Sequence, residues 1–153
     1  NKKYLSYKDF SKATVPDLFS EEKLQKSTQK KVNELKSMYF ENNGNGKFKG
    51  KPLLNLAQVS TIQDIAVEDF DKNGFMDILL VGNNRQISTQ LGRMDASHGL
   101  ILLNDENGEF QHIGVQEFNI KGEARSIEKA IINGIPHFIV GINNGSPIIL
   151  KQE

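Results

Sequence analysis

Short runs of apolar residues, separated by Asn-Gly pairs, characterise the chain from Met38 to its end. Asn-Gly occurs six times there, and both residues tolerate the positive φ angles that a two-residue hairpin turn requires. Regularly spaced runs of this kind predict an all-β core of short antiparallel strands. The predicted strands are 38–42, 47–50, 62–68, 76–82, 99–104, 109–114, 124–132, 136–142 and 147–151.

The first 37 residues have a helical pattern instead. Ser6 to Asp9 and Thr14 to Asp17 have the form of capping boxes, and Ser20 followed by two glutamates is a good helix start. These features predict one helix of about 18 residues from Ser20, preceded by one or two short turns, with its lysines on a solvated face. The apolar positions that recur near a period of 3.6 are Leu24, Thr28, Val32, Leu35 and Tyr39. The chain therefore divides into a helical segment, 1–37, and a β region, 38–153.

The strands of the β region also repeat. Residues 39–48 match 102–110 at an offset of about 62, and the pattern of 65–83 returns at 127–143. A fixed period with four strands per unit is typical of blade-like arrays. The predicted fold is mainly β: blade-like antiparallel four-stranded sheets of a partial β-propeller, with an N-terminal α-helical segment.

The blade count follows from that period. We expect the last two strands of one blade (38–50), one complete blade (about 62–114) and three strands of another (124–151). An incomplete array leaves open strand edges, and strands 38–50 could join those of 124–151 in a second sheet.

Composition excludes several classes of protein. The net charge is zero, which argues against a nucleic-acid or polybasic membrane surface. There is no Cys, so no disulfide framework or thiolate zinc site is available. No apolar run approaches the roughly 20 residues of a membrane-spanning helix, so no membrane insertion is expected. The first residue is Asn, which suggests a processed chain or a fragment.

One segment has the spacing of a metal site. In Asp69-Phe-Asp-Lys-Asn-Gly-Phe-Met-Asp77, oxygen-bearing side chains of Asp69, Asp71, Asn73 and Asp77 occupy positions 1, 3, 5 and 9, and the carbonyl of Phe75 is available at position 7. Ca²⁺ prefers six to eight oxygen ligands, and without a cation the carboxylates would repel one another. An EF-hand is excluded, because its position 12 needs Glu and its flanks need helices. The alternative is an Asp/Asn-rich turn without metal.

This segment resembles a known family. Residues 67–83, Val-Glu-Asp-Phe-Asp-Lys-Asn-Gly-Phe-Met-Asp-Ile-Leu-Leu-Val-Gly-Asn, are similar to an FG-GAP/VCBS repeat, the β-propeller blade of integrin α-chains and many bacterial surface proteins. The resemblance implies a calcium ion on the hairpin between the first two strands of a blade, with Asp69, Asp71, Asn73 and Asp77 as side-chain ligands and Phe75 as a carbonyl ligand.

The wider resemblance covers about residues 37–150 and is to the C-terminal part of large secreted repeat proteins of Bacteroidetes type. It implies an extracytoplasmic location (secreted, cell surface or periplasmic). The last unit departs from the pattern, because 131–138 carries none of the acidic ligands. One calcium site is therefore expected rather than two.

The other polar residues favour a structural role. His98, His112 and His137 have no partner at metal-ligand spacing, and no nucleophile, phosphate-loop or zinc-protease motif is present. The long excursion 84–98, which contains Arg85, Arg93, Asp95 and His98, is either a ligand-binding loop or, as we favour, a packed loop in which Arg93 and Asp95 make internal contacts.

The sequence therefore predicts a non-catalytic, calcium-binding extracellular module for binding or scaffolding. Its expected partners are a protein or glycan ligand and the remaining propeller blades. A first alternative is a glycan-recognition or accessory domain of a polysaccharide-processing system, although 84–98 has no aromatic platform. A second is an enzyme whose active site lies in other blades.

Overall fold

The computed structural model describes residues 4–88, 90–112 and 118–152, and the chain divides into two compact units, Asn1–Leu35 and Lys36–Glu153. The first unit holds three short helices: α1 (Tyr7–Phe10), α2 (Val15–Leu18) and α3 (Glu21–Gln25). The predicted capping box at Thr14–Asp17 is present, and Ser6 caps α1 through one of the two expected bonds. The Oγ atom of Ser6 accepts from the backbone N–H of Asp9 at 3.1 Å, and the carboxylate of Asp17 accepts from the backbone N–H of Thr14 at 2.8 Å.

The predicted helix of about 18 residues is wrong. α3 ends at Gln25, and no helix or strand follows until Met38. An amphipathic helix in a protein is stabilised mainly by packing of its apolar face. None of the residues in the three helices is buried, and Val32 and Leu35 are 71% and 89% exposed. Because no core lies against this segment, the periodic apolar pattern is not enough to extend the helix beyond the five residues of α3.

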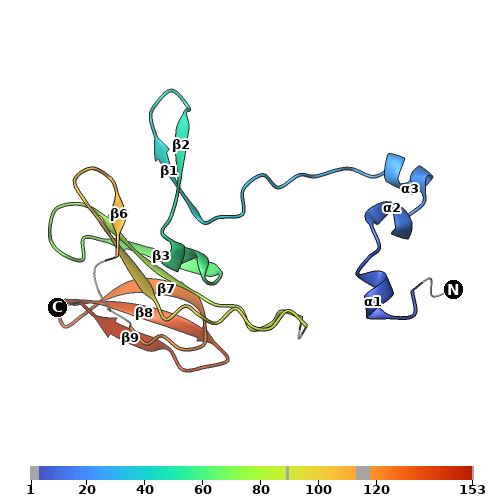
Figure 1. Ribbon diagram of the computed structural model, residues 1–153. Helices are drawn as coiled ribbons and strands as arrows, with labels where there is room; N and C mark the ends of the chain where they lie inside the picture. The colour runs from blue at the N-terminus through green and yellow to red at the C-terminus, as the bar shows by residue number, and fades with distance from the viewer. Residues whose placement is uncertain (1–3, 89, 113–117, 153) are drawn as a thin grey trace. The chain divides into compact units, whose positions relative to one another are not determined.

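The second unit is antiparallel β structure arranged in three sheets (Figure 1). The first is a two-stranded sheet and the second a four-stranded sheet, with a short 3₁₀ helix, η1 (Asn55–Gln58), between them in the sequence. The third has three strands in the order β7-β8-β9. The strands are β1 (Met38–Asn42), β2 (Phe48–Pro52), β3 (Ile62–Glu68), β4 (Asp77–Gly82), β5 (Leu100–Asn104), β6 (Phe110–Gln111), β7 (Glu123–Ile132), β8 (Ile135–Asn143) and β9 (Ile148–Lys151).

These sheets confirm the mainly β prediction and its strand positions within a few residues. The strand predicted at 109–114 is shorter, since β6 ends at Gln111, and residues 113–114 lie outside the described part. In the described chain β1–β2 forms a sheet separate from β7–β9, so the joining of these strands that the sequence left open does not occur. Whether the three sheets are blades of a propeller stays a prediction.

Strand β4 of the four-stranded sheet is buried on both faces. Residues Leu79, Leu80 and Val81 of β4 are each at most 2% exposed. Successive side chains of a strand point to opposite faces, so a continuous buried run requires a cover on each side. One face packs against the third sheet through a core that includes Leu79, Val81, Ile127, Phe138 and Val140. The other packs Leu80 and Leu102 against Ala57 of η1.

The β1–β2 hairpin contacts the β5–β6 hairpin. The rings of Tyr39 and Phe110 meet edge to face with centroids 5.1 Å apart. The ammonium of Lys51 lies 3.2 Å from a carboxylate oxygen of Glu109. Residues from the two sheets therefore share both an aromatic and a charged contact.

One Asn-Gly turn has the predicted two-residue geometry. Asn133 and Gly134 have φ angles of 52° and 77° and separate the paired residues Ile132 and Ile135. Positive φ at both positions is the requirement of a type I′ turn. This turn fixes the register of β7 against β8.

Candidate metal centre

Three carboxylates of the Asp69–Asp77 loop converge. One oxygen from each of Asp69, Asp71 and Asp77 lies within 4.8 Å of the others. Oxygens bound to a single Ca²⁺, each about 2.3–2.6 Å from the ion, lie within about 5 Å of one another. The spacing of these three side chains is therefore compatible with one shared cation.

The backbone of the loop holds Asp69 and Asp71 in place. Lys72 and Gly74 have φ angles of 62° and 93°, which turn the chain back on itself. The two carboxylate oxygens of Asp69 accept from the backbone N–H groups of Asn73 and Gly74, at 3.1 and 2.9 Å. Asp71 also accepts from the N–H of Asn73, at 3.1 Å. The turn thus aims its N–H groups at the acidic residues and leaves oxygen lone pairs for a further ligand.

Asp77 is the buried member of the set. Its exposure is 0%, although it is a carboxylate at the start of β4. One oxygen accepts from the backbone N–H of Phe70 and the other from that of Asn104, both at 2.7 Å. Short bonds from backbone N–H groups to a carboxylate are charge-assisted and strong. Asp77 therefore fixes the loop to the end of the third strand, β5.

Asn73 is close to the cluster but its oxygen is turned away from it. Oδ1 accepts from the N–H of Phe75 at 2.8 Å, and Nδ2 donates to Asp71 and to the carbonyl of Asn104, each at 3.1 Å. Ligation through Asn73 requires its amide to turn so that Oδ1 replaces Nδ2. The sequence motif predicts Phe75 as a carbonyl ligand, and this stays a prediction.

Asn104 was not found from the sequence. It ends β5, and its Nδ2 donates to the carbonyl of Met76 at 3.1 Å. Its Oδ1 is buried and has no hydrogen-bond partner among the described residues. A buried amide oxygen without a partner is costly, so an orphan of this kind beside a carboxylate cluster fits a site that is completed by a ligand.

The donor set is hard and all-oxygen. Three carboxylates and one amide suit Ca²⁺ or Mg²⁺, whereas the described residues offer no group of His or Cys that would select a softer metal. Among the described residues this is also the one group of three acidic or metal-binding side chains close enough to share an ion. The counterpart turn at Asn133-Gly134 carries no acidic ligand.

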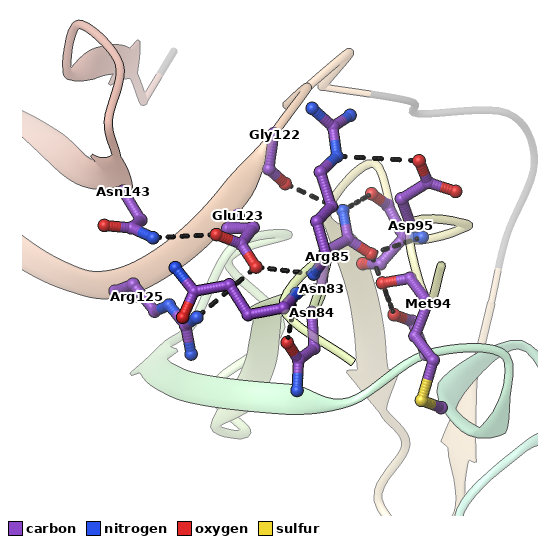
Figure 2. Close-up of polar contacts among 12 residues, drawn as sticks. Asn83, Asn84, Arg85, Met94, Asp95, Gly122, Glu123, Arg125 and Asn143 are labelled. Atoms are coloured by element: carbon purple, nitrogen blue, oxygen red, sulfur yellow. Dashed lines mark hydrogen bonds and ion pairs between the residues drawn. The ribbon is translucent and has the colours of Figure 1, made fainter. Parts of the chain in front are cut away.

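A second polar cluster anchors the excursion 84–98 (Figure 2). Asn83 is 1% exposed; its Nδ2 donates to the carbonyls of Ser97 and Gly122 at 2.7 and 2.9 Å, and its Oδ1 accepts from Ser97 N–H at 3.0 Å and from Ser60 Oγ at 2.8 Å. These bonds join both ends of the excursion to the chain just before β7. The loop is therefore packed at its base, as favoured from the sequence, although Asp95 pairs with Arg85 at 3.5 Å.

Glu123, at the start of β7, completes that cluster. It is 6% exposed and accepts from the backbone N–H of Arg85, from Nδ2 of Asn143 at 2.7 Å and from the guanidinium of Arg125 at 3.4 Å. These donors, the N–H of Arg85 foremost, lower the pKa of Glu123 below its ordinary value of 4.5. Figure 2 shows this carboxylate between Asn143 and Arg85.

A pH dependence of stability follows. Because the pKa of Glu123 is lower in the folded chain, its ionised form contributes stability that is present above pH 4.5 and is lost as the pH falls through the folded pKa. We expect the stability difference between the unmutated chain and Glu123→Gln, measured by urea unfolding, to shrink as the pH falls below 4.5. A difference that stays constant from pH 7 to pH 3 would contradict this assignment.

Two of the histidines lie within hydrogen-bond distance of backbone carbonyls. His112 Nδ1 lies 3.2 Å from the carbonyl of Ile101, and His137 Nδ1 lies 2.9 Å from that of Ile135. Among the described residues no group of three metal-binding side chains includes a histidine.

Fold and loop together define a mainly β protein with a candidate oxygen-ligand cation site. Residues 32–80 match the family model of the FG-GAP-like repeat, and the matched span runs through β1, β2 and β3 into β4 and contains the whole Asp69–Asp77 loop. Repeats of this family are typically extracellular and generally non-catalytic. No curated protein and no solved structure matches the chain. No helix in the described residues is long and apolar enough to cross a membrane.

Proposed function

We propose that the Asp69–Asp77 loop binds one Ca²⁺ ion and that the chain is a non-catalytic extracellular module for binding or scaffolding. The observation that carries the proposal is the convergence of three carboxylates within 4.8 Å on one tight turn. The FG-GAP-like match over residues 32–80 supports it, because the matched span includes this turn. The orphaned Oδ1 atom of Asn104 beside the loop supports it as well.

The chemistry of the ion is electrostatic: Ca²⁺ neutralises the clustered carboxylates. The residues of the chain supply the positioning. Asp69 and Asp71 lie on the turn, and Asp77, the first residue of β4, places its carboxylate close to theirs. A ligand bound only by the folded state adds RT ln(1 + [Ca²⁺]/Kd) to the free energy of unfolding, which is about 2.7 kcal/mol at one hundred times Kd. The cation would thus stabilise the hairpin formed by β3 and β4.

We further propose that the sheets are blades of a larger propeller. The strand numbers of two, four and three fit the last part, the whole and the first part of consecutive four-stranded blades. β3 and β7 are joined by an ion pair between Glu68 and Lys129, and Asp64 accepts from the N–H of Ile127 at 2.9 Å. Contacts of this kind are what successive stacked blades would make.

Apolar side chains are left uncovered at both ends of the stack. On β3, Ile65 and Val67 are 49% and 58% exposed, and on β9, Ile149 is 58% exposed. Neighbouring blades of the same propeller would bury these residues. We infer that such blades are the first partners of this chain, while a protein or glycan is the ligand of the assembled module.

The test of the calcium site is thermal unfolding in calcium, in EDTA and in magnesium. We expect saturating calcium to raise the Tm of the unmutated chain by roughly 10 °C. Asp71→Ala should abolish this rise and leave the Tm in EDTA nearly unchanged, because Asp71 is exposed and its carboxylate accepts from the neighbouring Asn73.

The matched control is Asp95→Ala. Asp95 is also a partly exposed aspartate in a loop, but its partner is Arg85, outside the acidic turn. This variant should keep the full response to calcium. If the Tm of the unmutated chain is the same in calcium as in EDTA, the site assignment is wrong.

A further inference from the structure

Asn104 connects the acidic turn to the third strand of its sheet. Its N–H donates to Asp77, its carbonyl accepts from Asn73, and its Nδ2 donates to the carbonyl of Met76. Asn104 is 27 residues from Asp77 in sequence and therefore brings a distant hairpin to the turn. Three of its four polar groups are used in this way.

The fourth group is the orphaned Oδ1 atom. It is shielded from solvent and has no partner among the described residues. An amide oxygen accepts two hydrogen bonds in water, and burying it without any costs about 1–3 kcal/mol. Asn104 therefore has an incomplete set of interactions at the edge of a carboxylate cluster.

An internal counterpart shows what this asparagine does where no acidic turn is beside it. Asn42 ends β1 as Asn104 ends β5, and each precedes an Asn-Gly hairpin in the repeated segment. Oδ1 of Asn42 accepts from the N–H of Gly44, 2.9 Å away, within its own hairpin. Oδ1 of Asn104 has no such bond. The side chain of Asn104 is instead directed to Met76 of the neighbouring turn.

The hairpin that Asn104 begins leads to a second one. Asp105 accepts from the N–H groups of Asn107 and Glu109, at 2.9 and 2.8 Å, which makes the turn compact. The following residues, Glu109 and Phe110, contact Lys51 and Tyr39 of the β1–β2 hairpin. A continuous set of contacts thus runs from the acidic turn through Asn104 to β1–β2.

We propose that Asn104 is a positioning residue of the cation site and couples cation binding in the Asp69–Asp77 loop to the rigidity of the β5–β6 and β1–β2 hairpins. This inference rests on the proposed calcium function. Ordering of Met76 is transmitted to β5 through Nδ2 of Asn104, a bond that depends on this side chain, whereas the bond from the N–H of Asn104 to Asp77 is made by the backbone. The consequence is a cation-dependent clamp between neighbouring sheets.

Hydrogen exchange on the full chain tests the clamp, with calcium binding measured separately by calorimetry. In the unmutated chain we expect calcium to slow exchange about 10-fold or more in three places: the turn (70–77), the β5–β6 hairpin (104–111) and the β1–β2 hairpin (38–52). Asn104→Ala should still bind calcium and protect the turn, but it should lose the added protection of both hairpins. Asn42→Ala is the matched control: it loses a bond inside its own hairpin, but calcium should still slow exchange in all three places.

The outcomes separate the two proposals. If calorimetry detects no calcium binding to the unmutated chain, the proposed function fails, and the coupling fails with it. If calcium binds and protects the turn but neither hairpin, only the coupling is overturned. Retained protection of both hairpins in Asn104→Ala also overturns it. Should Asn104→Ala not fold, Asn104→Thr answers the same question, since threonine favours strands and cannot make the amide bond to Met76.

Discussion

Replacing Asp77 with alanine is expected to lower the free energy of unfolding by about 3 to 5 kcal/mol in EDTA, where no cation contributes. The carboxylate is fully buried and is the acceptor for the N–H groups of Phe70 and Asn104. Its removal leaves two partly buried donors without these bonds, and each costs about 1–3 kcal/mol. The loss of two charge-assisted bonds makes this the most damaging single change in the loop.

Urea unfolding of three variants checks this expectation. Asp77→Asn keeps the size of the side chain, but its Nδ2 must face one of the two N–H donors, so its stability should fall between those of the unmutated chain and Asp77→Ala. Asp71→Ala should cost less than 1 kcal/mol under the same conditions, because Asp71 is exposed. Equal effects at positions 71 and 77 would show that burial of Asp77 is not what matters.

The contrast separates two roles within one motif. Asp69 and Asp71 lie on the turn, where their carboxylates accept from N–H groups no more than five residues away. Asp77 holds together segments that are far apart in the sequence. A nine-residue spacing predicts oxygen ligands, but it does not distinguish a residue that serves only the cation from one that the fold also requires. Measurements with and without calcium make that distinction.

The strands were predictable because their determinants are local. Asn133 and Gly134 are residue types that tolerate the positive φ they adopt, and their turn sets the pairing of Ile132 with Ile135. Alternation then assigns the faces of each strand. β4 is apolar in continuous sequence because it is covered on both faces, and this too is visible as a run of Ile, Leu, Leu and Val.

The helix was not predictable in the same way. Leu24, Val32 and Leu35 have helical spacing, but a helix beyond its first turns depends on what its apolar side packs against. The sequence shows the pattern and not the packing partner. With Leu35 89% exposed, the expected apolar face contributes nothing, and only the Ser20 helix start remains in α3.

The same limit applies to the polar residues around the site. Three carboxylates could be grouped because they belong to one segment, whereas Asn104, Asn83 and Glu123 act on residues 27, 39 and 38 positions away. No spacing rule connects such positions. One signal was present for Asn104: the repeated segments 39–48 and 102–110 align its position with Asn42, which marks the residue but not its contact with the acidic turn.

Replacing Asn83 with alanine is expected to cost about 4 kcal/mol, because its side chain is the common partner of several buried groups. Without it, the N–H and carbonyl of Ser97 and the carbonyl of Gly122 lose their bonds to the side chain. Ser60 keeps a partner, since the carbonyl of Met94, 2.9 Å from its Oγ, can accept the single hydroxyl proton once Asn83 is gone. Alanine must in addition adopt the φ of 97° that Asn83 has, a conformation that costs about 1 kcal/mol or more for a side chain with Cβ.

Asn83→Gly separates these two contributions. Glycine loses the same hydrogen bonds but accepts positive φ without strain, so it should be about 1 kcal/mol more stable than the alanine variant. Both variants should also release the base of the excursion 84–98, seen as faster hydrogen exchange there, while the strands β7–β9 stay protected. If glycine proved no better than alanine, the strain would be absent. If both cost less than 1 kcal/mol, the bonds of Asn83 would not be what joins this loop to the start of β7.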